Sequence, residues 1–105
     1  MEDLNYSFNR WLSFNLHFLL NSTNDGIFNT ALLNSSEYEK LTRLEGGIVY
    51  YYVGSYTSGV KKADIKLTVD NNDTYYFIVS TTPIFKDQAT YDYPTDVVLT
   101  VYISD

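Results

Sequence analysis

Two segments in the second half of the chain alternate in side-chain character with a period of two. Between residues 62 and 70, charged and hydroxyl side chains separate four apolar ones, which are Ala63, Ile65, Leu67 and Val69. Because successive side chains of a strand point to opposite faces, this pattern predicts a strand with one buried face and one wet face. A last predicted strand repeats the pattern with Val97, Leu99, Val101 and Ile103. Such alternation is typical of an antiparallel sheet.

Two further segments are rich in β-branched and aromatic residues, which favour strands. They are residues 48–53, IVYYYV, and residues 74–80, TYYFIVS. The second segment is apolar on both faces and is therefore predicted to be a central strand. The polar run at residues 70–73 predicts a tight hairpin loop, and residues 54–59 contain a Ser-Gly turn signal. The four strands are expected in meander order.

Residues 3–21 fit both a helix and a strand. The helical period aligns Leu4, Phe8, Trp11, Leu12, Leu16 and Leu19. The two-residue period aligns Phe8, Leu12, Phe14, Leu16, Phe18 and Leu20 almost as well. A run of about 17 residues without Gly or Pro is ordinary for a helix and long for a strand, so we predict a helix.

A second, shorter helix is predicted over residues 36–45. Ser36 and Glu39 have the spacing of a capping box, and the Gly46–Gly47 pair is placed to end the helix. The short apolar segment at residues 27–33 fits either a helical turn or a strand.

Together these elements predict a single domain of the α+β class over residues 1–105. N-terminal helices would pack on one face of a mainly antiparallel sheet of four or more strands. A chain of 105 residues has the usual length of one domain and can bury a core without covalent cross-links.

The composition disfavours several kinds of function. The net charge of −6 and the pI near 4.5 oppose binding to nucleic-acid phosphates and to anionic membranes. Mimicry of nucleic acid is a minor alternative, because the 13 acids are scattered along the chain. The absence of cysteine excludes disulfides, thiolate zinc sites and a cysteine nucleophile. The acidic N-terminus has no signal peptide, so we expect a cytoplasmic location, in a host cell, or a place in an assembled particle.

No residue pattern indicates a catalytic, cofactor-binding or metal site. His17 is the only histidine, and no G-x-S-x-G pattern selects a serine to act with it. The run at residues 70–73 lacks the spacing and the distal Glu of a calcium loop. We therefore predict no metal, no cofactor and no enzymatic activity.

Tyrosine is the strongest positive signal. The chain has 11 Tyr, a residue enriched at interfaces because it buries a large area at low entropic cost. The long loop from Thr81 to Thr95 also carries more apolar side chains than a solvated loop needs. These side chains either contact a partner or fold back to cap the core. The predicted partner-binding residues are Phe14, Tyr50, Tyr52, Ile84, Phe85, Tyr91 and Tyr93.

These features predict a non-enzymatic protein–protein interaction domain, namely a small structural subunit of a larger viral or phage-like assembly. Its partners would be proteins, with self-assembly as one mode, rather than nucleic acid, membrane or a small-molecule substrate. The alternative is a small acidic inhibitor or immunity-type protein, whose charge would steer it to one basic target. A carbohydrate-binding module, with Tyr rings stacked on sugars, ranks third.

Overall fold

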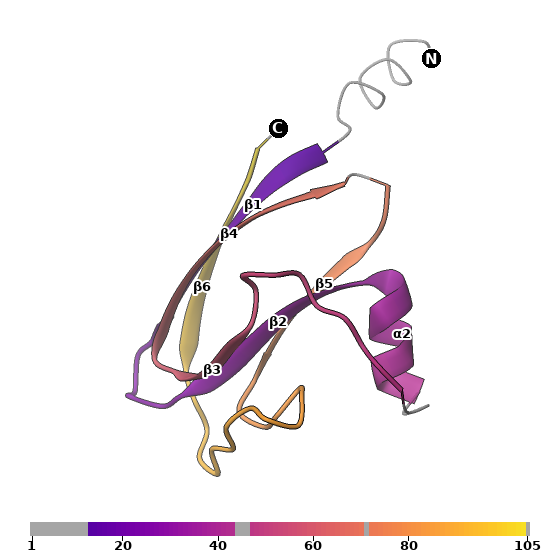
Figure 1. Cartoon of the computed structure of the whole chain (residues 1–105). Helices are drawn as coiled ribbons and strands as arrows, with labels where there is room; N and C mark the ends of the chain where they lie inside the picture. Colours follow the sequence, from indigo (N-terminus) through magenta and orange to yellow (C-terminus); the bar gives the residue numbers. More distant parts are fainter. Residues whose placement is uncertain (1–12, 44–46, 71, 105) are drawn as a thin grey trace.

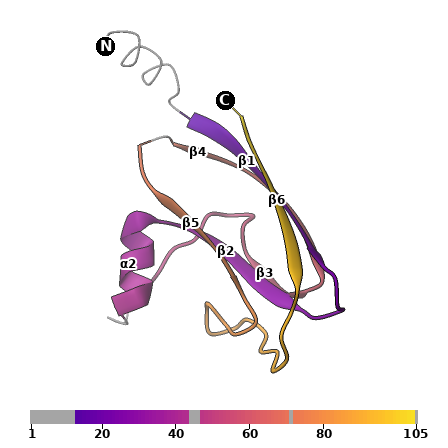
Figure 2. The same cartoon turned by 180° about the vertical axis from the view of Figure 1, so that it is seen from behind.

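A computed structural model describes residues 13–43, 47–70 and 72–104 (Figure 1). Within these ranges the chain forms six strands and one short helix. The elements are β1 (Ser13–Ser22), β2 (Phe28–Asn34), α2 (Ser35–Arg43), β3 (Thr57–Val60), β4 (Lys62–Asp70), β5 (Tyr75–Ser80) and β6 (Val97–Ser104). The strands make two three-stranded antiparallel sheets, sheet A in the order β4-β1-β6 and sheet B in the order β3-β2-β5. Figure 2 shows the two sheets from behind, with α2 beside β2 and β5.

The predicted α+β fold, with N-terminal helices on a four-stranded sheet, is wrong. Of the first predicted helix, residues 13–21 lie in β1, and residues 3–12 lie outside the described residues. The two-residue period decides the structure, because Leu16, Phe18 and Leu20 are buried on one face of β1. β1 also pairs with a strand on each side, and these tertiary contacts outweigh the length argument that favoured a helix.

The predicted meander order is also wrong. The polar run at residues 70–73 connects β4 of sheet A to β5 of sheet B, so it joins two sheets and is not a hairpin loop. β5 pairs with β2 alone and is an edge strand rather than a central one. Its two faces are nevertheless partly covered, because Phe77 stacks on Phe18 in the core and Tyr76 stacks on Tyr38 of α2. β5 is therefore apolar on both faces because it packs against β1 on one side and against α2 on the other.

Three other predicted elements are confirmed. The strands predicted around residues 63–69 and 97–103 are confirmed as β4 and β6. The helix predicted over 36–45 is confirmed as α2, with residues 44–46 outside the described residues. Its N-cap is Asn34 rather than Ser36, because the Asn34 Oδ1 accepts a hydrogen bond from the Glu37 N–H at 2.9 Å.

The predicted strand at residues 48–53 is wrong, since this segment is irregular and largely exposed. It contacts β2 through the Tyr52 N–H, which donates to the Leu32 carbonyl at 3.0 Å. Its aromatic composition fits a strand, but no neighbouring strand pairs with it along its length. Residues 27–33 mostly belong to β2, and β3 lies partly where a turn was predicted.

The hydrophobic core lies between the two sheets. Its buried members come from β1, β2 and β4 and are Leu16, Phe18, Leu20, Phe28, Leu32, Ile65 and Val69. The closest ring contact between the sheets stacks Phe18 on Phe77, with ring centroids 4.0 Å apart and planes 5° apart. Phe14 of β1 meets Tyr75 of β5 edge to face at 6.3 Å. β5 therefore packs over β1.

Two buried amide side chains hold the loop between β5 and β6 against sheet B. The Gln88 Nε2 donates to the carbonyls of Thr30 and Thr57, and its Oε1 accepts from the N–H groups of Ile84 and Phe85 at 2.8 and 2.9 Å. Asn29 of β2 similarly bonds to the backbone of Thr82, Ala89 and Gly59. The loop is thus fixed from within, because each amide satisfies backbone groups that water would otherwise have to reach.

Replacing Gln88 with Leu should therefore lower the free energy of unfolding by about 3 kcal/mol, because it leaves buried backbone donors and acceptors without partners. Chemical denaturation monitored by Tyr and Trp fluorescence measures the change. The control is Lys86→Ala, an exposed position in the same loop, which should change stability by less than about 0.5 kcal/mol. Equal stability of Gln88→Leu and wild type would show that this amide does not hold the loop.

Candidate functional site

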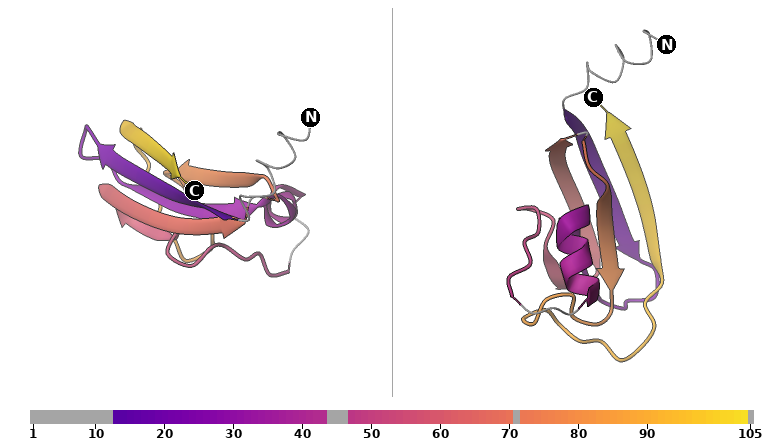
Figure 3. Two further views of the ribbon diagram at one scale, coloured as in Figure 1. Left: turned by 90° about the horizontal axis from the view of Figure 1, so that it is seen from above. Right: turned by 90° about the vertical axis from the view of Figure 1, so that its right-hand side faces the viewer.

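β6 forms one margin of sheet A, and Figure 3 shows it beside β1 with its other edge open. Five of its apolar or aromatic side chains are between 44% and 63% exposed, namely Val98, Leu99, Val101, Tyr102 and Ile103. Single exposed apolar residues are ordinary, whereas several of them gathered on one strand indicate an interaction site. We define the β6 surface as residues Val97–Ser104.

The inner face of β6 is uncovered because the two sheets are offset. β5, the edge strand of sheet B, packs over β1 through the contact between Phe18 and Phe77. Leu99, Val101 and Ile103 pair with the buried residues of β1, so they point to the core face of sheet A. Among the described residues, no strand of sheet B lies beyond β5 to cover them. These three side chains therefore lie on the same face of sheet A as the core residues, but they stay exposed to solvent.

The backbone of β6 also has a free edge, whose residues follow from the ladder of β1. The Ser22 N–H donates to the Lys61 carbonyl at 2.8 Å, and the Thr23 N–H donates to the Asp96 carbonyl at 2.9 Å. β1 thus bonds toward β4 at even positions and toward β6 at odd positions, as an antiparallel ladder requires. The residues of β6 whose N–H and C=O groups point away from β1 are Val97, Leu99, Val101 and Ile103.

Two of the other three sheet edges, β4 and β3, are protected, whereas β6 is not. β5, the remaining edge, is shorter than β6 at six residues, and its Tyr76 and Phe77 stack on Tyr38 and Phe18. β4, at the opposite margin of sheet A, carries exposed charges at Lys62, Asp64, Lys66 and Asp70. β3 is only four residues long, and natural proteins commonly protect sheet edges with charges, short strands, proline or bulges. β6 has eight residues with an unbroken register, no charge and no proline. It is therefore a ready template for an added strand.

A cluster of aromatic side chains lies away from β6, where the segment between α2 and β3 meets the loop after β5. Tyr51 contacts Tyr56 at 5.1 Å and Phe85 at 5.2 Å between ring centroids, and Tyr56 lies 6.4 Å from Phe85. We call these three residues the aromatic loop cluster. Burial, with a hydrogen bond to Asp87, raises the pKa of the Tyr56 hydroxyl above its usual value. The cluster thus joins the segment after α2 to the loop after β5.

The structure does not gather the seven predicted partner-binding residues into one patch. Phe14 and Tyr52 are half-buried, and both contact Tyr75 at the margin of the core. Ile84 and Phe85 are also half-buried, in the loop held by Gln88. Phe14 and Tyr52 thus pack against the core, Ile84 and Phe85 belong to a fixed loop, and the partner-binding role of all four stays a prediction.

Tyr50 and Tyr93 are the most exposed of the predicted residues, at 65% and 69%. Tyr91 is half-buried and meets Tyr93 edge to face at 5.7 Å. The backbone N–H of Tyr50 donates to Glu37 Oε1 at 2.8 Å, and this bond lowers the pKa of the Glu37 carboxyl. Tyr50 and Tyr93 therefore remain open to a partner, and their role stays a prediction.

Tyrosine content did not point to the β6 surface, which contains one tyrosine. β6 was expected as an alternating last strand, and the exposure of its apolar side chains was not predicted. The signal was the absence of charge in VVLTVYIS, in a chain where the alternating segment at residues 62–70 carries charges on its wet face. Exposure itself could not be read from sequence, because it depends on the offset between sheets.

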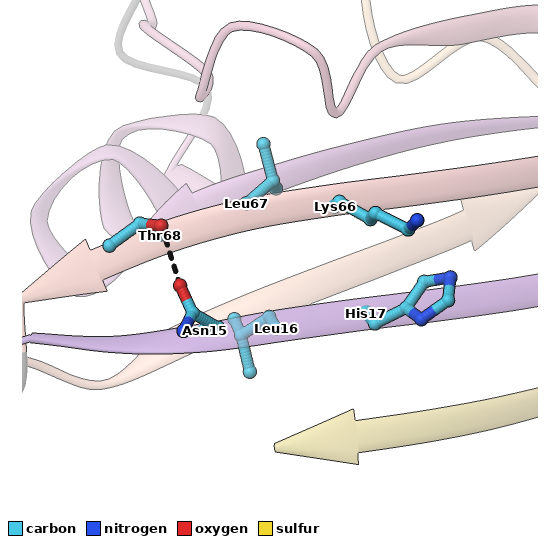
Figure 4. Close-up of a pocket in the computed structure, with 6 residues that line it drawn as sticks. All are labelled: Asn15, Leu16, His17, Lys66, Leu67 and Thr68. Atoms are coloured by element: carbon cyan, nitrogen blue, oxygen red, sulfur yellow. Dashed lines mark hydrogen bonds between the residues drawn. The ribbon is translucent and has the colours of Figure 1, made fainter. Parts of the chain in front are cut away.

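The polar outer face of sheet A carries His17, which lies on β1 and not on a helix. Its Nε2 lies 2.7 Å from Asp64 Oδ1, and its ring packs beside Tyr102. In the described part of the chain no serine hydroxyl bonds to His17, so the pair does not form a catalytic triad. A shallow depression of about 270 Å³ adjoins it (Figure 4). Its lining residues are Asn15, Leu16, His17, Lys66, Leu67 and Thr68.

Two absences hold for the described residues, 13–43, 47–70 and 72–104. No three His, Asp or Glu side chains there lie close enough together to hold a metal ion. No helix there is long and apolar enough to cross a membrane.

Comparison with known proteins gives no relative. No protein-family model matches the chain, and neither the curated proteins nor the solved structures contain a significant match.

Alanine substitutions should distinguish packed from exposed aromatics in the loop after β5. Phe85→Ala should lower the free energy of unfolding by about 2 kcal/mol, because its ring contacts Tyr51 and Tyr56. Tyr93→Ala should lower it by less than about 1 kcal/mol, because that side chain is largely in solvent. Thermal and chemical denaturation of both variants measure the difference. The reverse order of stability would contradict the packing described for this loop.

Proposed function

We propose that this chain is a non-enzymatic protein–protein interaction domain that self-associates through the β6 surface, as a structural subunit of a larger assembly. The observation that supports it is the coincidence, on one strand, of a free backbone edge and five exposed apolar or aromatic side chains. Strand addition at such an edge forms main-chain hydrogen bonds and covers side chains in one step.

The energetics favour association at β6 over association at β4, the other edge of sheet A. Covering the apolar side chains of β6 contributes about 25 cal/mol for each Å² removed from water. At β4 an incoming strand would first have to desolvate or pair the charges of Lys62, Asp64 and Lys66. No such cost applies along residues 97–104, which carry no charge.

Salt distinguishes this proposal from the acidic inhibitor. Two molecules with a net charge of −6 repel each other at long range, and added salt screens that repulsion. Self-association through an uncharged strand should therefore persist or strengthen at high salt. Binding of an acidic inhibitor to a basic target would instead weaken with salt. The viral or phage-like setting of the assembly stays a prediction from size and composition.

The test is solution mass by light scattering on a sizing column, at several protein concentrations and at low and high salt. Wild type should show a mass that rises with concentration under both conditions. Val101→Lys places a charge in the middle of the β6 surface and should weaken self-association about tenfold or more. The matched control is Val53→Lys, at a turn position that is 90% exposed, and it should associate like wild type.

Two results would contradict the proposal. A wild-type monomer at every concentration and salt would remove self-association and leave a binder of one separate target. Equal association of wild type, Val101→Lys and Val53→Lys would place the contact elsewhere on the molecule.

A further inference from the structure

We infer that two copies of the chain pair antiparallel along β6, about a two-fold axis at Thr100, so that sheet A continues as a six-stranded sheet. This inference rests on the proposed function and specifies the partner, the direction and the register. A two-fold contact of this kind is isologous, since the same strand serves both copies.

The backbone selects the register. In an antiparallel pair, the closely bonded positions join residues whose N–H and C=O groups both point to the shared edge. On β6 these are the odd-numbered residues from Val97 to Ile103, as the ladder of β1 shows. A two-fold axis at Thr100 places Val97 opposite Ile103 and Leu99 opposite Val101 of the second copy. A symmetric register centred one position earlier or later would leave one of these odd-numbered residues without a partner on β6.

The side chains are compatible with this register. On the outer face Thr100 lies opposite Thr100 of the second copy, in a non-hydrogen-bonded pair where the side chains are close, and Thr–Thr pairs stabilise sheets. Val98 lies opposite Tyr102, which pairs an aromatic with a β-branched residue. On the inner face every pair is apolar. The three side chains left uncovered by sheet B therefore gain apolar neighbours across the axis.

The charges are also compatible. Asp96, just before β6, lies opposite Ser104 of the second copy, so this pair does not place like charges opposite one another. The charged edge strand β4 lies on the far side of β1 from the contact. This arrangement lets a protein with a net charge of −6 present a neutral strand to a second copy.

A contact only one strand wide lies at the small end of protein interfaces, so a covalent trap is the sharpest test. The full chain contains no cysteine, and Thr100→Cys therefore introduces a single thiol. The two Cα atoms of such a pair should lie about 4.5 Å apart. Disulfides span about 4.4–6.8 Å. Val98→Cys is the matched control, on the same exposed face, because its two copies would lie four residues apart, or about 14 Å.

Under mild oxidation, Thr100→Cys should form a disulfide-linked dimer at least about tenfold faster than Val98→Cys, as measured on non-reducing gels. Adding Val101→Lys to Thr100→Cys should slow the cross-link to the rate of the control. Equal cross-linking of the two cysteine variants, or no dimer from Thr100→Cys, would overturn the register. If association still depends on Val101 in that case, the proposed function stands and only this pairing fails.

Hydrogen exchange of the unmodified chain gives a second measurement that needs no variant. Raising the protein concentration should protect the backbone amides of Leu99, Val101 and Ile103, which point to the free edge. The amides of Val98, Thr100 and Tyr102 already bond within sheet A and should change little. Protection of neither set, or of the second set only, would overturn the inference.

Discussion

The stacked contact between Phe18 and Phe77 fixes how the two sheets overlap. Because Phe77 lies on an edge strand and Phe18 on a central one, the two sheets are offset by one strand. The burial of Ile65 and Val69 on β4 shows that sheet B is displaced toward β4. β2 is consequently buried along nearly its whole length, and β6 is exposed along nearly its whole length. The core and the interaction surface are thus two results of one offset.

The loops around sheet B differ from β6 in that their polar groups are hydrogen-bonded within the molecule. Polar groups buried beside β2 are satisfied by fixed partners, such as the Thr30 hydroxyl on the Ser55 carbonyl at 2.8 Å. Among the described residues, no buried side-chain nitrogen or oxygen lacks a hydrogen-bond partner. The aromatic loop cluster therefore sits on a rigid base, whereas β6 is supported through its pairing with β1 alone. Of these two surfaces, β6 is the one whose backbone N–H and C=O groups can pair with a partner strand.

The sequence allowed local elements to be predicted better than their pairing. β4, β6 and α2 follow from periodicity and capping residues, which act over a few positions. The structure of residues 13–21 and the place of β5 depend on which distant strands lie beside and above them, and a short pattern does not contain that information. For the same reason, the predicted partner-binding residues included Phe14 and Tyr52, which the fold packs against Tyr75. Exposure of β6 required knowledge of the opposite sheet.

Neither sheet is formed by a continuous stretch of chain. β1 pairs with strands that follow it only after most of sheet B, so that Asn15 lies opposite Ser104. Such non-local pairing slows folding, because long loops must close before the contacts form. Until β6 docks on β1, both of its edges and its uncharged side chains are open to other unfolded chains. The lack of charge on β6 therefore carries a kinetic cost. Sheet A must form before partly folded chains associate with one another, so the yield on refolding should fall as the protein concentration rises.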